Sequence, residues 1–301
     1  MKRNFNFSNL FKKANVLSLI LFILSIACIA IKGLNYGIDF KGGTLIELRV
    51  LDKNITISDI RSSFKNMVIG DVNIKEFGNK NDYLIKIEQT NENNKNLIIE
   101  LKNNISKNLN TDLDFRRVEN VGPKVSSELL EAGLIAITLS LAAMLFYIWI
   151  RFEWQFSIGA IMALFHDVVI TMGIFSLLSF EINLSIIAAV LTIVGYSMND
   201  TVVIYDRIRE NLSKYNKLNI NDISNLSINE TLSRTLITSV TTLLALFSIF
   251  ILGGEILKGF SFAMILGVII GTYSSIFVAS PILKYFRVTY KTMQKEEQKI
   301  I

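Results

Sequence analysis

Six long apolar stretches divide the chain, and the segments between them are polar and charged. A transmembrane helix needs about 17–25 predominantly apolar residues, and each stretch reaches that length. The stretches are Ala14–Ile31, Ala132–Ile150, Gln155–Phe180, Ile182–Tyr205, Thr235–Gly254 and Gly259–Leu283. They predict six transmembrane helices.

The composition agrees with a membrane protein. Of the 301 residues, 51% are hydrophobic and only 19% are charged. The first stretch resembles a secretory signal, but its uncharged run is longer than a usual signal core and no small-residue cleavage site follows it. We therefore expect residues 14–32 to be a retained transmembrane helix.

Basic residues gather on one side of the predicted spans. Membrane proteins keep an excess of Lys and Arg in their cytoplasmic flanks. Here those residues lie before the first span, after the second, after the fourth and after the sixth. We expect both termini, residues 1–13 and 284–301, to be cytoplasmic. The net charge of +5 follows from this topology, with some attraction to anionic membrane lipids, and requires no nucleic acid partner.

The segment 33–131 is then an external domain, and residues 132–283 form the membrane domain with helices two to six. Alternating apolar positions predict strands in "GTLIELRVL", "DVNIKEFG", "DYLIKIE" and "TDLDFRRVENVG". Helical spacing predicts helices over 55–67, with Ser58 as the N-cap, and over 96–109. A hairpin turn is expected at Asn79–Asn81. The order strand–helix–strand–strand–helix–strand predicts a ferredoxin-like α+β domain.

No motif in the sequence supports an enzymatic function. The chain has one histidine and one cysteine, Cys28, so an HExxH zinc motif and an intrachain disulfide are both excluded. A phosphate-binding loop is absent, and so is the GxGD partner that an intramembrane aspartyl protease requires. We expect no enzyme activity, no metal and no cofactor.

Polar residues inside the predicted spans are the candidate functional residues. A carboxylate near the bilayer centre costs roughly 2.5–3.5 kcal/mol on insertion scales, and such groups often mark ion or proton pathways. On the fourth span, Asn199 and Asp200 share a face with Thr192 and Tyr196. Arg234 begins a stripe of threonines at matching depth on the fifth span, where it could compensate Asp200.

The third span adds His166 and Asp167. The pKa of an unperturbed histidine lies near 6.5, so this side chain can change charge at physiological pH. A proton relay is predicted from five residues, namely Asn199, Asp200, Arg234, His166 and Asp167. The alternative is that they are buried pairs and interhelical hydrogen bonds with a structural role only.

Small residues predict close helix packing. Gly195 lies on the polar face of the fourth span, and Gly267 and Gly271 form a small-residue face on the sixth span with Ser274 and Ser275. Such faces allow membrane helices to approach closely.

Several motifs together resemble the SecF family of bacterial protein-export membrane subunits, within the resistance–nodulation–division superfamily. They are "YGIDFKGGTLIEL" (36–48), "VGPKVSSEL" (121–129), "RFEWQFSIGAIMALFHDVVIT" (151–171), "VGYSMNDTVVIYDRIREN" (194–211) and "TLSRTLITSVTTL" (231–243). The first contains the residues Gly37, Asp39, Gly42 and Gly43. The resemblance covers nearly the whole chain.

The resemblance implies a function in protein export. It implies a bacterial inner-membrane subunit that pairs with SecD, associates with the SecYEG channel and uses the proton-motive force to promote late translocation of unfolded preproteins. It also implies that Asp200 and Arg234 match positions linked to proton conduction. We expect the helices to couple to the external domain through the connections at 35–43 and 119–128.

Two other functions stay open at this point. One is a self-contained exporter of small molecules or ions in the same superfamily, which would require a second half or a dimer. The other is a non-transducing scaffold that stabilises a partner in the membrane. The sequence does not distinguish H⁺ from Na⁺ as the coupling ion.

Overall fold

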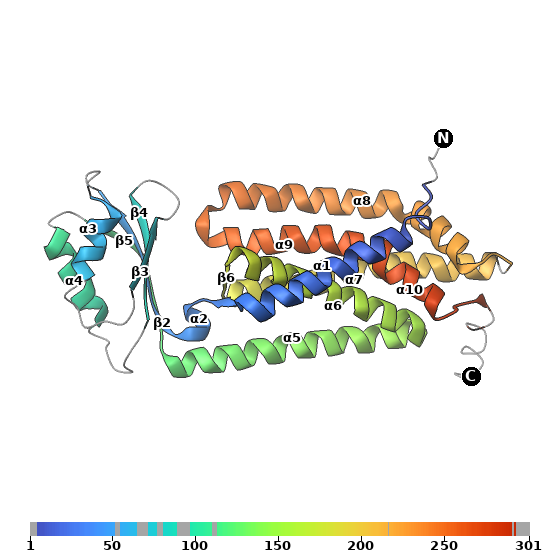
Figure 1. The fold of residues 1–301 in the computed structure, drawn as a ribbon, viewed down its shortest axis with the longest axis horizontal. Helices are drawn as coiled ribbons and strands as arrows, with labels where there is room; N and C mark the ends of the chain where they lie inside the picture. Colours follow the sequence, from blue (N-terminus) through green and yellow to red (C-terminus); the bar gives the residue numbers. More distant parts are fainter. Residues whose placement is uncertain are drawn as a thin grey trace. The chain divides into compact units, whose positions relative to one another are not determined.

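The computed structural model describes residues 5–51, 55–64, 72–76, 81–88, 97–109, 113–215, 217–290 and 292. The chain divides into two compact units, coloured along the sequence in Figure 1. The membrane unit comprises Met1–Asn35, Ala136–Phe180 and Ser185–Ile301. The sheet unit comprises Tyr36–Ile135 together with the short segment Glu181–Leu184.

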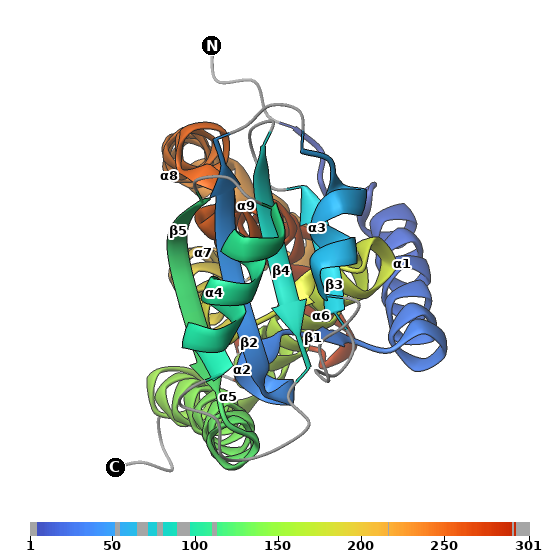
Figure 2. The same cartoon turned by 90° about the vertical axis from the view of Figure 1, so that its left-hand side faces the viewer.

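The sheet unit has the predicted ferredoxin-like fold. Its elements are β2 (Gly43–Val50), α3 (Ile57–Phe64), β3 (Val72–Glu76), β4 (Asp82–Ile87), α4 (Leu97–Leu109) and β5 (Leu113–Val121). The strand order is β3-β4-β2-β5, with every neighbouring pair antiparallel. Figure 2 shows α3 and α4 together on one face of this sheet. The sequence order of strands and helices is confirmed.

Alternation along the strands separates a hydrophobic face from a charged one. Ile46, Leu48 and Val50 of β2 are fully buried and pack with Ile60 of α3 and Ile105 of α4. The intervening positions carry ion pairs across the opposite face of the sheet. There Arg49 forms a two-pronged pair with Asp82 at 2.5 and 2.6 Å, and Arg117 pairs with Glu47 at 3.5 Å.

The start of α3 differs from the prediction. The helix begins at Ile57, so Ser58 lies inside it and is not the N-cap. Thr56 precedes the helix, and the Asp59 carboxylate accepts hydrogen bonds from the Thr56 backbone N–H at 2.8 Å and from its hydroxyl at 2.7 Å. A side chain at the third helical position that reaches back to the cap residue stabilises a helix start. These hydrogen bonds, from the hydroxyl first, lower the pKa of Asp59.

Three short elements were not predicted. They are β1 (Asn35–Tyr36), α2 (Ile38–Lys41) and β6 (Glu181–Ile182), and β1 pairs with β6. The predicted hairpin turn at Asn79–Asn81 lies largely outside the described residues, although Asn81 itself has a φ of 76°. Positive φ is typical of a turn residue, and Asn tolerates it better than most.

The membrane unit contains six helices long and apolar enough to cross a bilayer, which confirms the predicted fold class. They are α1 (Phe11–Lys32), α5 (Pro123–Arg151), α6 (Trp154–Leu178), α7 (Leu184–Lys214), α8 (Ile220–Leu252) and a composite sixth helix. That helix consists of α9 (Gly254–Ser274), a π-helical turn (Ser275–Ala279) and α10 (Ser280–Tyr285). The start of α1, the end of α7 and α10 lie at the same end of the unit (Figure 1).

Three of the spans are central and three are peripheral. About half of the side chains in the apolar parts of α6, α7 and the composite helix are buried, against fewer than a fifth in α1, α5 and α8. The peripheral helices expose many large apolar residues, among them Leu19, Leu139, Trp149, Leu244 and Ile251. Such surfaces suit lipid or a membrane partner, so the polar residues of interest are expected among the central helices.

Two of the three predicted packing glycines lie at close helix contacts. A Cβ added at Gly267 would lie 2.2 Å from Cγ1 of Ile193, and one at Gly271 would lie 2.9 Å from Cβ of Ser197. Both contacts join α9 to α7. Gly195 differs, because the nearest atom to its added Cβ is Cε of Met144 at an ordinary 3.9 Å. The structure therefore gives no close approach at Gly195.

Replacement of Gly267 by alanine should destabilise the protein. The added methyl would collide with Ile193, and overpacking of this kind costs about 1–3 kcal/mol. Gly195→Ala is the matched control: it has room, and it gains about 0.5–1 kcal/mol of helix propensity. Thermal unfolding in detergent should show a lower melting temperature for Gly267→Ala and an equal or higher one for Gly195→Ala. Equal melting temperatures for the two variants would contradict the close α7–α9 contact.

Candidate functional site

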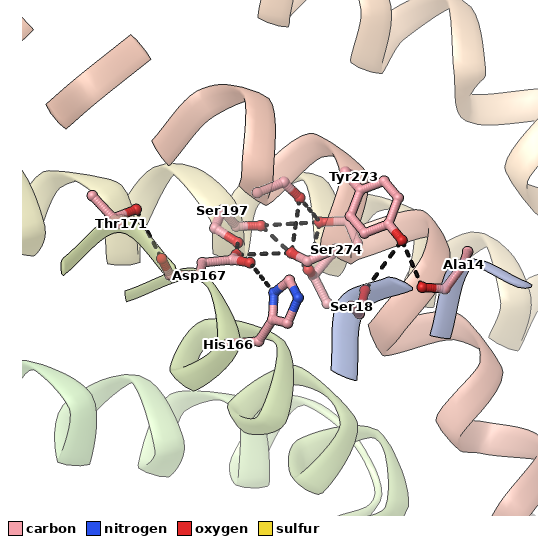
Figure 3. Close-up of polar contacts among 11 residues, drawn as sticks. Ala14, Ser18, His166, Asp167, Thr171, Ser197, Tyr273 and Ser274 are labelled. Carbon is pink, nitrogen blue, oxygen red and sulfur yellow. Dashed lines mark hydrogen bonds and ion pairs between the residues drawn. The ribbon is translucent and has the colours of Figure 1, made fainter. Parts of the chain in front are cut away.

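Asp167 of α6 is the centre of a hydrogen-bond network that joins three central helices (Figure 3). Its side chain is completely buried. Oδ1 lies 2.9 Å from Nδ1 of His166, and Oδ2 accepts hydrogen bonds from Ser197 of α7 at 2.6 Å and from Ser274 of α9 at 2.8 Å. A buried carboxylate requires such partners, because burial of an unpaired charge is very costly. Asp167 therefore connects α6, α7 and α9.

His166 has one nitrogen engaged and one without a partner. Its Nδ1 faces Asp167, and its ring is stacked parallel to Phe22 of α1, with centroids 6.5 Å apart. Nε2 is buried and has no hydrogen-bond partner among the described residues. Unsatisfied buried polar atoms are rare in proteins and call for an explanation. A proton or a water molecule at Nε2 would supply one.

The π-helical turn places further polar groups beside this network. Its first residue, Ser275, lies 2.8 Å from the Thr201 hydroxyl of α7. Its last residue, Ala279, accepts a hydrogen bond at its carbonyl from the fully buried Tyr205 at 3.0 Å. A Cβ added at Gly159 would lie 2.3 Å from the hydroxyl oxygen of Tyr205, so only glycine leaves room for this hydroxyl. Single π-helical turns occur frequently at functional sites, since they free backbone groups from the regular helix.

Asp200 lies in a separate, incompletely satisfied environment between α7, α8 and α9. Its side chain is 3% exposed and lies near the hydroxyl of Thr272 of α9. The Thr272 hydroxyl also lies 2.7 Å from the Ser239 hydroxyl of α8. Oδ2 of Asp200 has no partner among the described residues, and the same holds for the buried hydroxyl of Thr235. One oxygen of the carboxylate is thus open to a proton, a cation or water.

Arg234 does not form an ion pair with Asp200. No nitrogen of Arg234 lies within 4.0 Å of an Asp200 oxygen, although both residues lie in the described part of the chain. Arg234 is exposed and acts on Asp200 through a longer-range attraction. Asn199 is also exposed, one residue away from the face that buries Asp200. The two are near the site and not in it.

The predicted polar stripe on α8, Arg234, Thr238 and Thr241/Thr242, makes one described contact with a neighbouring helix, through Thr242. Thr238 and Thr241 donate hydrogen bonds only to carbonyls of their own helix. The described buried polar residues of α8 are Ser224, Ser227, Thr231, Thr235 and Ser239. One residue corresponds to about 100° of helix rotation, so periodicity alone did not fix which stripe faces inward. The predicted stripe on α7 does contain a cross-helix contact, from Tyr196 to Thr242 at 3.3 Å.

The glycine motif of the sheet unit has a clear conformational reason. Gly42 and Gly43 have φ values of 78° and 134°, which residues with a side chain rarely adopt. A Cβ at Gly43 would also lie 2.6 Å from the Ile87 carbonyl oxygen. Asp39, on α2, accepts a hydrogen bond at Oδ2 from the backbone N–H of Leu184 at 2.9 Å. Leu184 is the first residue of α7, so Asp39 caps that helix.

The hydroxyl partners of both carboxylates were missed from the sequence. Ser197 and Thr272 had no assigned role, and Ser274 and Ser275 were interpreted only as small packing residues. The spacing of Ser197 could have indicated a role, because it lies three residues before Asp200 and so on the same helix face. Serine and threonine are too common in membrane helices for that spacing to single it out.

These features define a multi-pass membrane protein with buried carboxylates at the contacts of its central helices. The chain belongs to the SecD/SecF family of protein export membrane proteins. The family model described as "Protein export membrane protein SecD/SecF, C-terminal" matches residues 101–289, and the "SecD/SecF GG Motif" matches residues 29–50. The resemblance inferred from the motifs is confirmed.

Curated relatives of similar length are SecF subunits. The protein translocase subunit SecF of Rickettsia bellii (strain OSU 85-389) is 47% identical over 286 residues, which cover 95% of this chain and 94% of the relative. The SecF of Rickettsia prowazekii (strain Madrid E) is 46% identical over 287 residues, covering 95% and 92%.

Two solved structures of SecDF resemble this structure. SecDF of Thermus thermophilus, described as a translocon-associated membrane protein, matches with a TM-score of 0.84 and 35% identity over 94% of this chain. SecDF in a super-membrane-facing form matches with a TM-score of 0.70 and 33% identity over 99% of this chain. The chain spans only 39% and 40% of those two SecDF chains.

Replacement of Asp167 should destabilise the bundle. Asp167→Ala leaves the hydroxyls of Ser197 and Ser274 without their common acceptor, and a lost buried partner costs about 1–3 kcal/mol. Thr171→Val is the control on the same helix, because the Thr171 hydroxyl donates only to the backbone carbonyl of Asp167 at 2.8 Å. Thermal unfolding in detergent should show a clear loss for Asp167→Ala and little change for Thr171→Val. An unchanged melting temperature for Asp167→Ala would mean that the network does not hold the helices together.

Proposed function

We propose that this protein is an accessory subunit of the Sec protein translocase. It works with a SecD subunit in the bacterial inner membrane and uses the proton-motive force to promote late translocation or release of exported proteins. Family membership and the SecF relatives of nearly equal length support this assignment. The likeness to about two fifths of SecDF supports the partnership, since a SecD chain would supply the rest.

The observation that carries the coupling proposal is the environment of Asp200. A carboxylate that is 3% exposed, with one oxygen that has no partner in the described part of the chain, can bind a proton and release it again. The Thr272 hydroxyl lies near the carboxylate, and Arg234 supplies a positive potential without forming an ion pair with it. Each elementary charge moved through 100 mV releases about 2.3 kcal/mol, enough to bias a two-state movement.

The other members of the relay have different roles. Asp167 holds the central helices together through two hydroxyls, and His166 lies beside it with Nε2 facing no hydrogen-bond partner among the described residues. Asn199 and Arg234 are exposed, so we place them at the edge of the relay and not among its buried groups.

The topology of the proposal places both termini in the cytoplasm. Its support is the basic character of the flanks and the ion pairs found there. Arg207 of α7 pairs with Glu230 of α8 at 2.6 Å, and Arg151 pairs with Asp206 at 2.8 Å. The sheet unit then lies on the outer side, where exported preproteins emerge from the SecYEG channel, and no enzymatic step is required of it.

Asp200→Asn should abolish the stimulation of export by the proton-motive force. The amide keeps the size and polarity of the side chain but cannot take up and release a proton, so insertion and folding should be retained. The measurement is export into inverted membrane vesicles with and without an imposed proton-motive force, at equal levels of the protein. A wild-type response by the Asn variant would favour the non-transducing scaffold.

Arg234 should act through its charge and not through direct contact. Because no ion pair joins it to Asp200, Arg234→Lys should retain most of the coupling, whereas Arg234→Ala should lose it. In the same vesicle assay, Asp200→Asn added to Arg234→Ala should cause little further loss, because both changes stop one step. Independent, additive losses would show that the two residues do not share a step.

A further inference from the structure

One turn of the composite sixth helix contacts four other helices of the membrane unit. Four consecutive residues each place a hydroxyl against a different helix, and they are Thr272, Tyr273, Ser274 and Ser275. Their partners lie, in the same order, on α8, α1, α6 and α7. Successive residues of a helix point about 100° apart, so these hydroxyls point around most of its circumference. The rotation of α9 about its axis therefore determines which hydroxyl faces which neighbour.

Tyr273 makes the contact with α1. Its hydroxyl donates a hydrogen bond to the Ala14 carbonyl at 2.8 Å and accepts one from the Ser18 hydroxyl at 3.1 Å. Ala14 and Ser18 are four residues apart, so they lie on the same face of α1. Figure 3 shows Tyr273 turned toward these two residues, whereas the next residue, Ser274, is turned toward Asp167. The tyrosine thus holds α9 to two successive turns of α1.

α1 is itself fixed against α6, the helix that carries Asp167. A Cβ added at Gly173 of α6 would lie 2.3 Å from Cβ of Ser25 of α1, so the two helices touch at this point. One turn further along α1, the Ser176 hydroxyl donates a hydrogen bond to the Cys28 carbonyl at 3.1 Å. The contacts α1–α6, α1–α9 and α6–α9 therefore close a triangle. Within a closed triangle, rotation of α9 requires that one of these contacts break.

We propose that Tyr273 is a positioning residue whose hydroxyl sets the rotation of α9. It thereby directs its two neighbours, Thr272 and Ser274, to the sites of the two buried carboxylates. A side-chain tip lies about 5 Å from the helix axis, so a rotation of about 10° moves it by about 1 Å. A displacement of that size would break the 2.8 Å hydrogen bond from Ser274 to Asp167. The consequence for coupling rests on the proposed function, in which Asp200 exchanges a proton.

The first test measures the rotation of α9 in the full-length protein and does not depend on export. The hydroxyl oxygens of Ser239 and Thr272 lie 2.7 Å apart, so cysteines at these positions are within reach of a disulfide bond of about 2.0 Å. Ser239→Cys and Thr272→Cys are introduced together into a Cys28→Ser background, and disulfide formation is followed after addition of an oxidant. Tyr273→Phe should slow it about fivefold, which corresponds to ~1 kcal/mol for one lost hydrogen bond.

Two further variants accompany Tyr273→Phe. Ser18→Ala retains the tyrosine and its hydrogen bond to Ala14, so it should slow disulfide formation less than Tyr273→Phe does. Ser261→Ala is the matched control, because it removes a buried hydroxyl of α9 whose described hydrogen bonds, at 2.6 and 3.2 Å, stay within the same helix. The control should leave the rate unchanged.

The second test measures coupling in the vesicle export assay, at matched membrane levels and without the added cysteines. Tyr273→Phe should lower the ratio of export with and without the proton-motive force, and Ser261→Ala should not. Thr272→Val added to Tyr273→Phe should cause little further loss, because both changes act on one contact. A merely structural tyrosine predicts a lower melting temperature with an unchanged ratio.

The outcomes separate the positioning role from the function on which its second test rests. Equal disulfide rates with and without Tyr273→Phe would overturn the positioning role, and so would the absence of a disulfide when Tyr273 is present. Slower disulfide formation with an unchanged export ratio would also overturn it, because the rotation would then not matter to the carboxylates. A wild-type response of Asp200→Asn would reject the proposed function, and the disulfide rates would still show whether Tyr273 sets the rotation.

Discussion

A carboxylate buried among membrane helices must find its hydrogen bonds within the protein, and the arrangement of the central helices depends on this requirement. Asp167 is satisfied by a hydroxyl from α7 and a hydroxyl from α9, at 2.6 and 2.8 Å. Such short distances are possible only where the helix backbones approach closely. Gly271 provides that approach, since a Cβ there would lie 2.9 Å from Cβ of Ser197. The carboxylate and the glycine are therefore two parts of one contact.

The two buried aspartates are treated differently by their surroundings. Asp167 has a partner for each oxygen, whereas one oxygen of Asp200 has none among the described residues. A fully satisfied group resists any change of state, because each change leaves a buried donor or acceptor unpaired. An incompletely satisfied group is easier to protonate or to hydrate. The difference is consistent with the proposal that Asp200, and not Asp167, is the proton-exchanging position.

The sequence was sufficient for what depends on long-range pattern. Six apolar stretches of membrane length and the alternating segments between the first two spans led to the confirmed fold class. The predictions that failed are those that required the position of a single residue. Ser58 was predicted as the cap, whereas the residue before the helix is Thr56, to which the Asp59 carboxylate reaches back. On α8 the choice between Arg234 and Thr235 as the inward position required the packing partner, which periodicity does not supply.

The partners of Asp167, and the contact of Asp39 with Leu184, lay beyond the sequence for a different reason. They depend on contacts between residues far apart in the chain, such as Asp39 with Leu184, and no local pattern encodes such contacts. The glycines of the motif were visible, and their positive φ values now explain them. The carboxylate between them had no local explanation, because its partner is the first residue of a helix that begins 145 positions later.

One helix connects all of these elements. α7 begins at the cap on Asp39, contributes Ser197 to the network of Asp167 and carries Asp200 one turn further on. Hydrogen bonds weaken steeply with distance and angle, so a shift of about 1 Å along α7 would break the contact of Ser197 with Asp167. In the proposed function, a movement of α7 would be opposed by the satisfied carboxylate of Asp167 and driven by protonation of Asp200. Opposition of this kind would favour two discrete positions over a continuous range, since packed interfaces are bistable and not freely deformable.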